Sequence, residues 1–248
     1  DDYISAGSAR NAIDCALWDL ECKSKDQDIW SLLDISKPTS LSCSYTIVLD
    51  TVENMLSDAI EHKNCPVVKI KVNNDNLENI LTGIRSKLPK AKIIIDANEG
   101  FTLETLKNNM SIFEKTKIDL IEQPLSPEID NQLLDFVSPI PICADESFHT
   151  IADFEEVSKK YEAINIKLDK TGGLSEALLI ANKAKRNDKI IMLGCMVATS
   201  LSMLPALSLY KYANFIDLDG PCFLKQDREN GIKYENGKME LNNRMCWG

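Results

Sequence analysis

Six ionisable residues stand at intervals along the chain, each at the end of a short run rich in β-forming residues. In order they are Lys71, Asp96, Glu122, Asp145, Lys167 and Asp217. The first five are separated by 25, 26, 23 and 22 residues, so each belongs to a different repeat of the chain. Three carboxylates with a lysine on either side could bind a cation and move protons, if the fold brings them together.

The three carboxylates predict a metal site. Converging carboxylates repel each other unless a cation neutralises them. Asp96, Glu122 and Asp145 offer only oxygen ligands, which suit one Mg²⁺ whose octahedron is completed by water or substrate oxygens. No His or Cys accompanies them, so a zinc site is disfavoured. The two histidines, His62 and His149, lie in a helical pattern and just after a strand, and we expect both to be structural or exposed.

The lysines predict proton transfer. Lys69 and Lys71 share strand parity, so both should point to the same side of their strand. Packing their ammonium groups together is expected to depress the pKa of at least one and to leave a neutral amine. Lys167, four strands later, could face the other side of a bound substrate. One base on each face of a carbon is the geometry that inverts a stereocentre, and a metal would stabilise the charge that appears as the proton leaves.

A strand followed by an amphipathic helix recurs along the chain and positions these residues. The predicted strands are Leu41–Leu49, Pro66–Lys71, Lys92–Asp96, Ile118–Glu122, Pro141–Ala144, Ala163–Lys167, Lys189–Leu193 and Asn214–Leu218. The helix patterns between them include Thr51–His62, Leu77–Leu88, Leu103–Lys115, Ile151–Tyr161, Leu174–Arg186 and Thr199–Tyr210. Strict alternation implies parallel strands joined by right-handed crossovers.

Eight such strands with seven intervening helices predict an α/β fold, a closed (β/α)7β TIM-type barrel. In this fold the carboxyl ends of all strands open on one face, where active sites lie. No G-x-G-x-x-G follows the first strand, which disfavours a dinucleotide-binding fold. We predict a helical lead-in over residues 1–40 with a helix at Ala9–Lys23, the barrel over 41–218, and a tail over 219–248. The tail should contain a hairpin over Gly231–Leu241, and both ends are typical of connections to another domain.

Bulk properties exclude some classes of function. The 248 residues are 44% hydrophobic and 27% charged, an ordinary globular composition. The formal net charge of −10 argues against binding to nucleic acid or anionic membranes. No apolar run approaches the roughly 20 residues of a membrane span. Eight cysteines without a C-x-x-C pair indicate reduced thiols in a cytoplasmic protein, although a targeting segment upstream of the first residue stays open.

Five short motifs carry a resemblance to a known family. They are Lys69-Ile70-Lys71, Asp96-Ala97-Asn98, Glu122-Gln123-Pro124, Ala144-Asp145-Glu146-Ser147 and Ile166-Lys167. With these motifs in this order, the chain resembles the enolase superfamily, in the subgroup similar to muconate-lactonising enzymes. The resemblance implies that Asp96, Glu122 and Asp145 bind Mg²⁺ and that Lys71 and Lys167 are the acid/base pair. It makes Lys69 an auxiliary lysine and Asn98 and Glu146 supporting groups around the metal ligands.

The last predicted strand points to one branch of that superfamily. Asp217-Leu218-Asp219-Gly220-Pro221 resembles the D-x-D of dipeptide epimerases, which implies that Asp217 and Asp219 bind the α-ammonium of the substrate. Lys170-Thr171-Gly172-Gly173 is similar to the same branch. The loops after strands seven and eight are apolar and acidic, which does not suit phosphate. Ala198 departs from the pattern, because related epimerases often carry an acidic residue there.

The resemblance implies Mg²⁺-dependent epimerisation of a dipeptide of the L-Ala-D/L-Glu type at the Cα of its C-terminal residue. Two bases would transfer the proton through a metal-stabilised enediolate, in a cytoplasmic homo-oligomer linked to cell-wall peptide metabolism. It also implies an N-terminal α+β capping domain, which we expect this chain to lack. The alternatives are a muconate cycloisomerase, an o-succinylbenzoate synthase, an N-acylamino acid racemase, or a non-catalytic metal-dependent binding protein. A lysine-dependent aldolase is disfavoured, because a Schiff base does not need three metal carboxylates.

Overall fold

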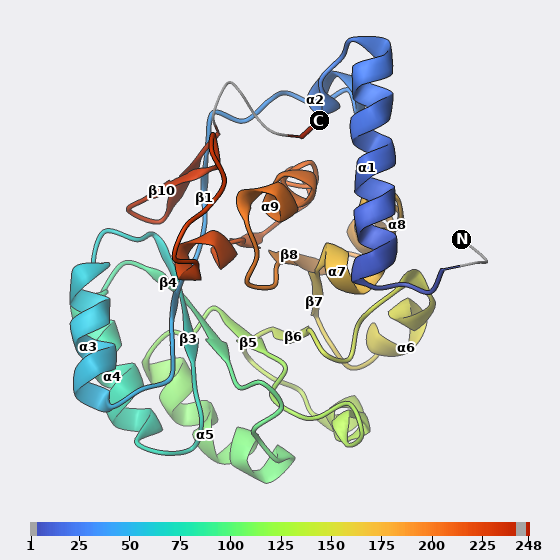
Figure 1. Cartoon of the computed structure of the whole chain (residues 1–248). Coiled ribbons are helices and arrows are strands. Elements are labelled where there is room, and N and C mark those ends of the chain that lie inside the picture. Colours follow the sequence, from blue (N-terminus) through green and yellow to red (C-terminus); the bar gives the residue numbers. More distant parts are fainter. Residues whose placement is uncertain (1–3, 242–246) are drawn as a thin grey trace.

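The computed structural model describes residues 4–241 and 247–248, and its central feature is one sheet of eight parallel strands (Figure 1). The strands are paired in chain order from β2 to β9. Their bounds are β2 Tyr45–Ile47, β3 Val67–Lys71, β4 Lys92–Asp96, β5 Leu120–Glu122, β6 Ile142–Ala144, β7 Ala163–Ile166, β8 Ile190–Gly194 and β9 Phe215–Asp217. This order is that of a TIM-type barrel, so the predicted fold class is confirmed.

The two outer strands of this sheet, β2 and β9, meet at a seam. The Ser44 N–H donates to the Ile216 carbonyl at 2.8 Å, and the Thr46 N–H donates to Asp219 Oδ2 at 2.8 Å. The Ser44 hydroxyl also donates to the Asp217 carboxylate. The barrel is therefore nearly closed, and much of its last contact is made by Asp217, at the end of β9, and by Asp219, just beyond it.

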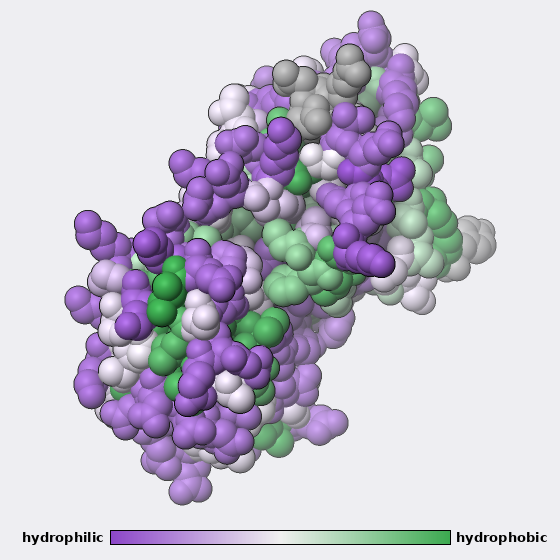
Figure 2. Space-filling model, turned by 60° about the vertical axis from the view of Figure 1, so that its left-hand side comes forward, coloured by the Kyte–Doolittle hydropathy of each residue, from purple (hydrophilic) through white to green (hydrophobic). Residues whose placement is uncertain are grey.

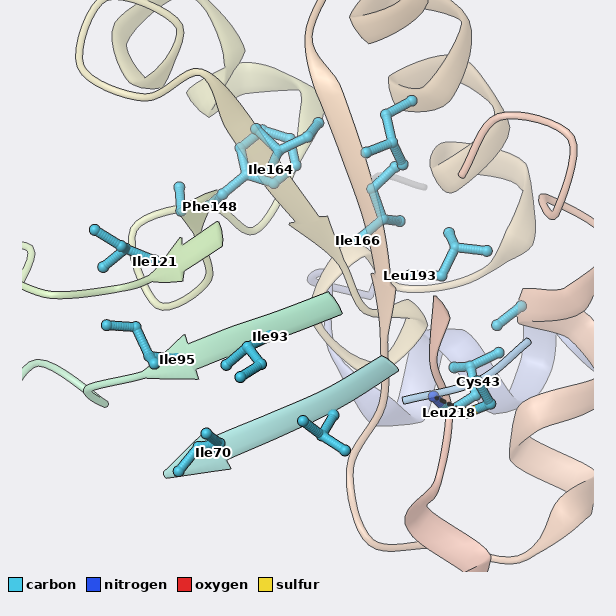
Figure 3. Close-up of a cluster of buried hydrophobic side chains, with 14 of the residues drawn as sticks. Cys43, Ile70, Ile93, Ile95, Ile121, Phe148, Ile164, Ile166, Leu193 and Leu218 are labelled. Carbon is cyan, nitrogen blue, oxygen red and sulfur yellow. Dashed lines mark hydrogen bonds between the residues drawn. The ribbon is translucent and has the colours of Figure 1, made fainter. Parts of the chain in front are cut away.

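Side chains alternate strictly between the two sides of the barrel wall. Odd-numbered positions of β4 and even-numbered positions of β3 and β7 belong to the larger hydrophobic cluster outside the barrel wall, which includes Ile70, Ile93, Ile95 and Ile164 (Figure 3). A second, smaller cluster fills the interior and consists of Ile94, Leu120, Cys143, Ala163, Met192 and Phe215. Two residues further along their strands, four of these inward positions carry the carboxylates Asp96, Glu122, Asp145 and Asp217. The parity predicted for Lys69 and Lys71 is confirmed.

Helices connect the strands and cover the outside of the barrel. They are α3 Val52–Glu61, α4 Leu77–Lys87, α5 Leu103–Lys115, α6 Phe154–Val157, α7 Leu168–Thr171, α8 Leu174–Arg186 and α9 Ser200–Leu207. Thr51 and Thr102 cap α3 and α5 by accepting the N–H three residues later, which fixes where these helices begin.

One predicted helix is shorter in the structure, and one connection is not α-helical. The pattern at Ile151–Tyr161 forms the 3₁₀ helix η2 Ile151–Asp153 and the single turn α6. The link between β5 and β6 contains the 3₁₀ helix η1 Asp130–Asp135 in place of the α-helix expected from seven full repeats. Four prolines, at positions 124, 127, 139 and 141, interrupt this link, and each removes a backbone donor.

The N-terminal and C-terminal segments lie together outside the barrel repeat. They contain α1 Ser8–Lys25, α2 Ile29–Leu32, β1 Ser40–Ser42, η3 Gly220–Phe223, β10 Lys233–Glu235 and β11 Lys238–Glu240. The predicted hairpin is confirmed, and its two turn residues, Asn236 and Gly237, have the positive φ of 50° and 67° that this tight turn requires. The single strand predicted over 41–49 is wrong, because β1 pairs with β11 whereas β2 joins the barrel.

On the face shown in Figure 2, hydrophilic residues predominate and hydrophobic ones are gathered in patches between them. Within the described residues, no helix is both long and apolar enough to cross a membrane.

Candidate active site

A cavity of about 490 Å³ lies at the carboxyl ends of the strands. The predicted site residues that line it are Lys69, Lys71, Asp96, Asn98, Asp145, Glu146, Lys167, Asp217 and Asp219. Glu122 lies beneath them and has no exposed surface. The structure thus brings the whole predicted set to one mouth. His149 is exposed, as expected, but it also lines this cavity.

Lys69 is the central cation of the site. Its Nζ lies 3.0 Å from Asp96 Oδ2, 2.7 Å from Glu122 Oε2 and 3.0 Å from Asp217 Oδ2. These carboxylates come from three different strands and are almost completely buried. One ammonium group therefore holds together the inner layer of the site.

This environment does not depress the pKa of Lys69. Burial pushes the pKa of Lys69 downward, but the charges of Asp217, Glu122 and Asp96 outweigh it and raise that pKa well above its ordinary value. For Asp96, burial is likewise outweighed by Lys69 and Lys71, which lower the pKa. Burial dominates at Glu122 and raises its pKa to about 8. Opposite charges, rather than the neighbouring lysine, decide the protonation of Lys69.

Lys71 lies at the outer end of β3 and is held by residues that follow the next strand. Its Nζ donates to Asn98 Oδ1 at 2.6 Å and lies 3.2 Å from Asp96 Oδ2. Asn98 adopts a left-handed backbone conformation, which Asn tolerates well, and its Nδ2 donates to Glu146 Oε1 at 3.2 Å. Asn98 thus contacts Lys71 directly, and Glu146 contacts Asn98.

The opposite wall of the barrel carries Lys167. Strands β3 and β7 are four apart in a ring of eight, so Lys71 and Lys167 approach the cavity from opposite sides. Lys167 Nζ donates to Asp145 Oδ2 at 2.6 Å, and the Lys170 ammonium contacts the other oxygen of the same carboxylate. Burial lowers the pKa of Lys170, whereas the charge of Asp145 overcomes burial and raises the pKa of Lys167.

Asp217 and Asp219 both reach the mouth of the barrel. Asp217 ends β9, and Asp219 follows two residues later at the start of η3. Each residue is only 5% exposed and both line the cavity. Burial, followed by the charge of Asp217, raises the pKa of Asp219 to about 7. Asp217 is already paired with Lys69, which leaves Asp219 as the more available partner for a ligand.

Sequence reasoning missed several residues that complete the site. Asn165 Nδ2 donates to Glu122 Oε1 at 2.7 Å, and Gln123 Oε1 accepts from the Asp145 N–H at 2.8 Å. Asn165 shares strand parity with Lys167, and this signal could have revealed it. Lys170 lies beyond the strand, so neither its contact with Asp145 nor the acceptor role of Gln123 follows from periodicity.

The carboxylates fit a hard divalent cation in chemistry, although lysines stand between them. Among residues 4–241 and 247–248, no three His, Cys, Asp or Glu side chains form a ready metal-binding group. Asp96 and Glu122 are bridged by Lys69, and Asp145 is occupied by two other ammonium groups. Glu122 Oε2 is buried and, apart from its ion pair with Lys69, makes no hydrogen bond of acceptable geometry. An all-oxygen donor set with such an atom suits Mg²⁺.

Two family models match the chain. Residues 51–248 match the model described as enolase C-terminal domain-like, and residues 2–34 match the N-terminal domain of mandelate racemase and muconate lactonizing enzyme. The chain therefore belongs to the enolase C-terminal domain-like family. Helix α1 falls in the part that matches the N-terminal domain, and this part is a short fragment.

Two similar relatives are named for action on different kinds of compound. An N-acetyl-D-glutamate racemase from Pseudoalteromonas is 40% identical over 99% of this chain and 78% of its own length. An L-Ala-D/L-Glu epimerase from Escherichia coli K12 is 38% identical over 96% of this chain and 75% of its own length. Both names denote inversion at a carbon of an amino acid derivative.

A solved structure of an enolase family member from Agrobacterium tumefaciens matches with a TM-score of 0.95 and 40% identity, covering 100% of this chain and 76% of that one. It is described as having homology to dipeptide epimerases and contains sodium and L-Ala-L-Glu. Solved dipeptide epimerases from Cytophaga hutchinsonii and Methylococcus capsulatus contain Mg with a bound dipeptide.

Proposed function

We propose that this protein is a Mg²⁺-dependent epimerase that inverts the Cα of the C-terminal residue of a dipeptide of the L-Ala-Glu type. One observation carries the proposal. Lys71 and Lys167 reach a single cavity from opposite strands, and carboxylates lie between them. A binding protein has no need of two lysines that face each other in this way.

The residues divide the reaction between them. Asp96, Glu122 and Asp145 would hold Mg²⁺, which supplies positive charge to the carboxylate of the substrate. One of Lys71 and Lys167, as the neutral amine, removes the Cα proton from one face, and the other, as the ammonium, delivers a proton to the opposite face. The roles reverse for the other epimer. Lys69 keeps the buried carboxylates in place and does not need to move a proton.

Asp219 supports recognition of a free amino group. A substrate ammonium against its buried carboxylate would gain a charge-assisted hydrogen bond, and Asp217 adds a second negative charge nearby. Free thiols among the described cysteines and the absence of a spanning helix in the same residues are compatible with the cytoplasm. We propose that the protein is a homo-oligomer in that compartment and acts on cell-wall peptides.

A second candidate is racemisation of N-acetylated glutamate, which the relative from Pseudoalteromonas favours. That substrate lacks an ammonium group and would leave Asp219 without a cationic partner. The two candidates therefore differ in what stands at the amino end of the substrate, while the metal and lysine chemistry is the same.

Comparison of kcat/KM for L-Ala-L-Glu, N-acetyl-L-Ala-L-Glu and N-acetyl-D-glutamate decides between them. Acetylation should lower kcat/KM by about tenfold or more, since a charge-assisted hydrogen bond is worth about 1.5–3 kcal/mol. Asp219→Asn should shrink this difference, because the unacetylated dipeptide loses most. Equal turnover of the free and acetylated dipeptides would overturn the dipeptide assignment, and preference for N-acetyl-D-glutamate would establish the second candidate.

A further inference from the structure

The segment that carries Lys167 is tied to α1 by contacts between residues more than 150 positions apart in the chain. Figure 1 shows α1 passing beside α7 and α8, the two helices that follow β7. Lys167 is the residue that precedes α7, and a single helical turn separates it from Gly172 and Gly173. The N–H groups of Gly172 and Gly173 both donate to the Leu168 carbonyl, at 2.9 and 3.1 Å. The Lys167 carbonyl in turn accepts the N–H groups of Lys170 and Thr171, at 2.9 and 3.0 Å, so hydrogen bonds connect the whole turn to Lys167.

Arg10 binds the outer end of that turn. Its guanidinium donates to the Thr171 carbonyl at 2.6 Å and to the Gly172 carbonyl at 3.2 Å. It also forms an ion pair with Glu176, whose other oxygen accepts the Ile151 N–H at 3.0 Å. Arg10 therefore connects the turn after β7 with the loop that follows Asp145. Both charged side chains are largely buried, at 16% and 19% exposed.

Two other polar residues of α1 complete this contact. Asp14 Oδ2 accepts the Ser175 N–H at 3.0 Å, at the start of α8, and Asn11 Nδ2 donates to Asp169 Oδ1 at 3.2 Å within α7. Together with Arg10 they bond to the middle and the end of the α7 turn and to the first turn of α8. We call Arg10, Asn11 and Asp14 the α1 clamp.

Gly172 and Gly173 lie where any side chain would collide with the α1 clamp. A Cβ on Gly172 would stand 2.3 Å from Arg10 Nε, and one on Gly173 would stand 2.4 Å from the Asp14 Cβ. Both glycines also have positive φ, at 82° and 128°, which other residues rarely adopt. The Gly172-Gly173 pair is thus explained by close approach of α1, independently of any ligand.

The turn also presents Lys170 to the site. Lys170 is one residue before Thr171, whose carbonyl Arg10 binds, and its ammonium contacts both the carboxylate and the backbone carbonyl of Asp145. Any shift of the turn therefore moves both lysines relative to Asp145, whose own N–H is held by Gln123. The β3 side of the cavity has a different support, because Lys71 is held by Asn98 from the neighbouring strand.

We propose that the α1 clamp is a positioning device for one face of the reaction, holding Lys167 and Lys170 against Asp145, with Arg10 as its principal residue. This inference rests on the proposed two-lysine chemistry. None of the clamp residues needs to touch the substrate. Loss of the clamp should impair the proton transfer made by Lys167 and leave that made by Lys71 largely intact.

The test measures exchange of the Cα hydrogen of each dipeptide epimer with D₂O in two backgrounds of the full chain. Lys71→Ala leaves Lys167 as the remaining base, and Lys167→Ala leaves Lys71. Adding Arg10→Ala should slow exchange at least about tenfold in the first background, because small misplacements of a catalytic group cost this much or more. In the Lys167→Ala background, adding Arg10→Ala should change the rate of exchange by no more than about twofold.

Arg85→Ala is the matched control. Arg85 also donates to backbone carbonyls, including those of Thr116 and Ala91 at 2.7 Å, but it does so where β4 begins, at the opposite end of the barrel. This variant should lower the melting temperature and change both backgrounds equally. Arg10→Lys keeps a cation for Glu176 but cannot reproduce the forked contact with two carbonyls, and it serves as the milder variant if Arg10→Ala unfolds.

Equal slowing in both backgrounds, or no slowing in either, would overturn the clamp. Exchange in neither lysine background with any dipeptide would mean that the proposed function fails. The clamp is then decided by amide hydrogen exchange. Arg10→Ala should speed exchange over residues 170–175, whereas Arg85→Ala should not. Unchanged protection of this segment would overturn the clamp by itself.

Discussion

The two lysines assigned to proton transfer lie in different surroundings. The Lys71 side chain is 37% exposed and is bonded to Asn98, which follows the adjacent strand. The Lys167 side chain is 11% exposed and shares Asp145 with Lys170. One half of the site is therefore built from neighbouring strands alone, whereas the other half depends on a helix far away in the sequence.

Because the two lysines have different supports, the position of one can change without a change in the position of the other. Local supports, such as the Asn98 contact with Lys71, follow from strand order and are fixed by the barrel itself. The α1 clamp is an outside support, so its strength depends on how the N-terminal segment packs. The two halves meet only at the carboxylates between them. Perturbing each half, and the carboxylates that they share, separates these contributions.

Removal of the cation should have the largest effect, because both lysines transfer a proton at the same Cα, next to the substrate carboxylate that the cation would bind. Charge stabilisation by a metal is worth several kcal/mol, so chelation should lower kcat by about 10³-fold or more, reversibly on return of Mg²⁺. Calorimetry should show weaker Mg²⁺ binding in Asp96→Ala, Glu122→Ala and Asp145→Ala. Asp119→Ala, a carboxylate at the far end of the barrel, is the control. Unchanged affinity in all three variants would mean that the metal site is wrongly placed.

Loss of Lys69 should mainly affect stability. Lys69→Met leaves three buried carboxylates without their shared counterion, which should reduce the free energy of unfolding by about 3–5 kcal/mol without divalent cations. Lys71→Met removes a half-exposed ion pair and should cost at most about 1 kcal/mol. Urea denaturation measures both. Similar losses in the two variants would show that Lys69 is not the central cation.

Asn98→Ala should have the smallest effect and sharpens the comparison. It removes one hydrogen bond to Lys71, worth about 1 kcal/mol, and should slow the exchange that depends on Lys71 by about fivefold. Exchange through Lys167 should not change. This pattern is the mirror image of that expected for Arg10→Ala, and D₂O exchange in the two single-lysine backgrounds reports both. If Asn98→Ala slowed only the Lys167 reaction, the division into two halves would be wrong.

Local periodicity explains why much of the barrel could be predicted. Side chains alternate along a strand with a period of two residues, which places Asp96, Glu122 and Lys167 on the inner side of the barrel wall. The order of the strands along the chain then places these residues around one mouth. The fold class and the gathering of the site residues therefore followed from the sequence. Their chemical roles remain predictions that the mutants above test.

Contacts between distant segments explain what could not be predicted. The chain passes from β1 to β2 at Cys43. The Cys43 N–H donates to the Gly237 carbonyl in the tail, whereas the Ser44 N–H donates to the Ile216 carbonyl in the barrel. No local sequence pattern predicts that the pairing of this segment changes from the tail to the barrel. The raised pKa of Lys69 has the same origin, because it depends on carboxylates from three other strands.

Deuterium exchange by the two single-lysine variants tests the central claim most directly. With Mg²⁺ and L-Ala-L-Glu or L-Ala-D-Glu in D₂O, Lys71→Ala and Lys167→Ala should both lose epimerisation, by about 10²-fold or more. Each variant should still exchange the Cα hydrogen of one epimer, and the two variants should exchange opposite epimers. Full epimerisation by either variant, or exchange of the same epimer by both, would contradict proton transfer from opposite faces of the barrel.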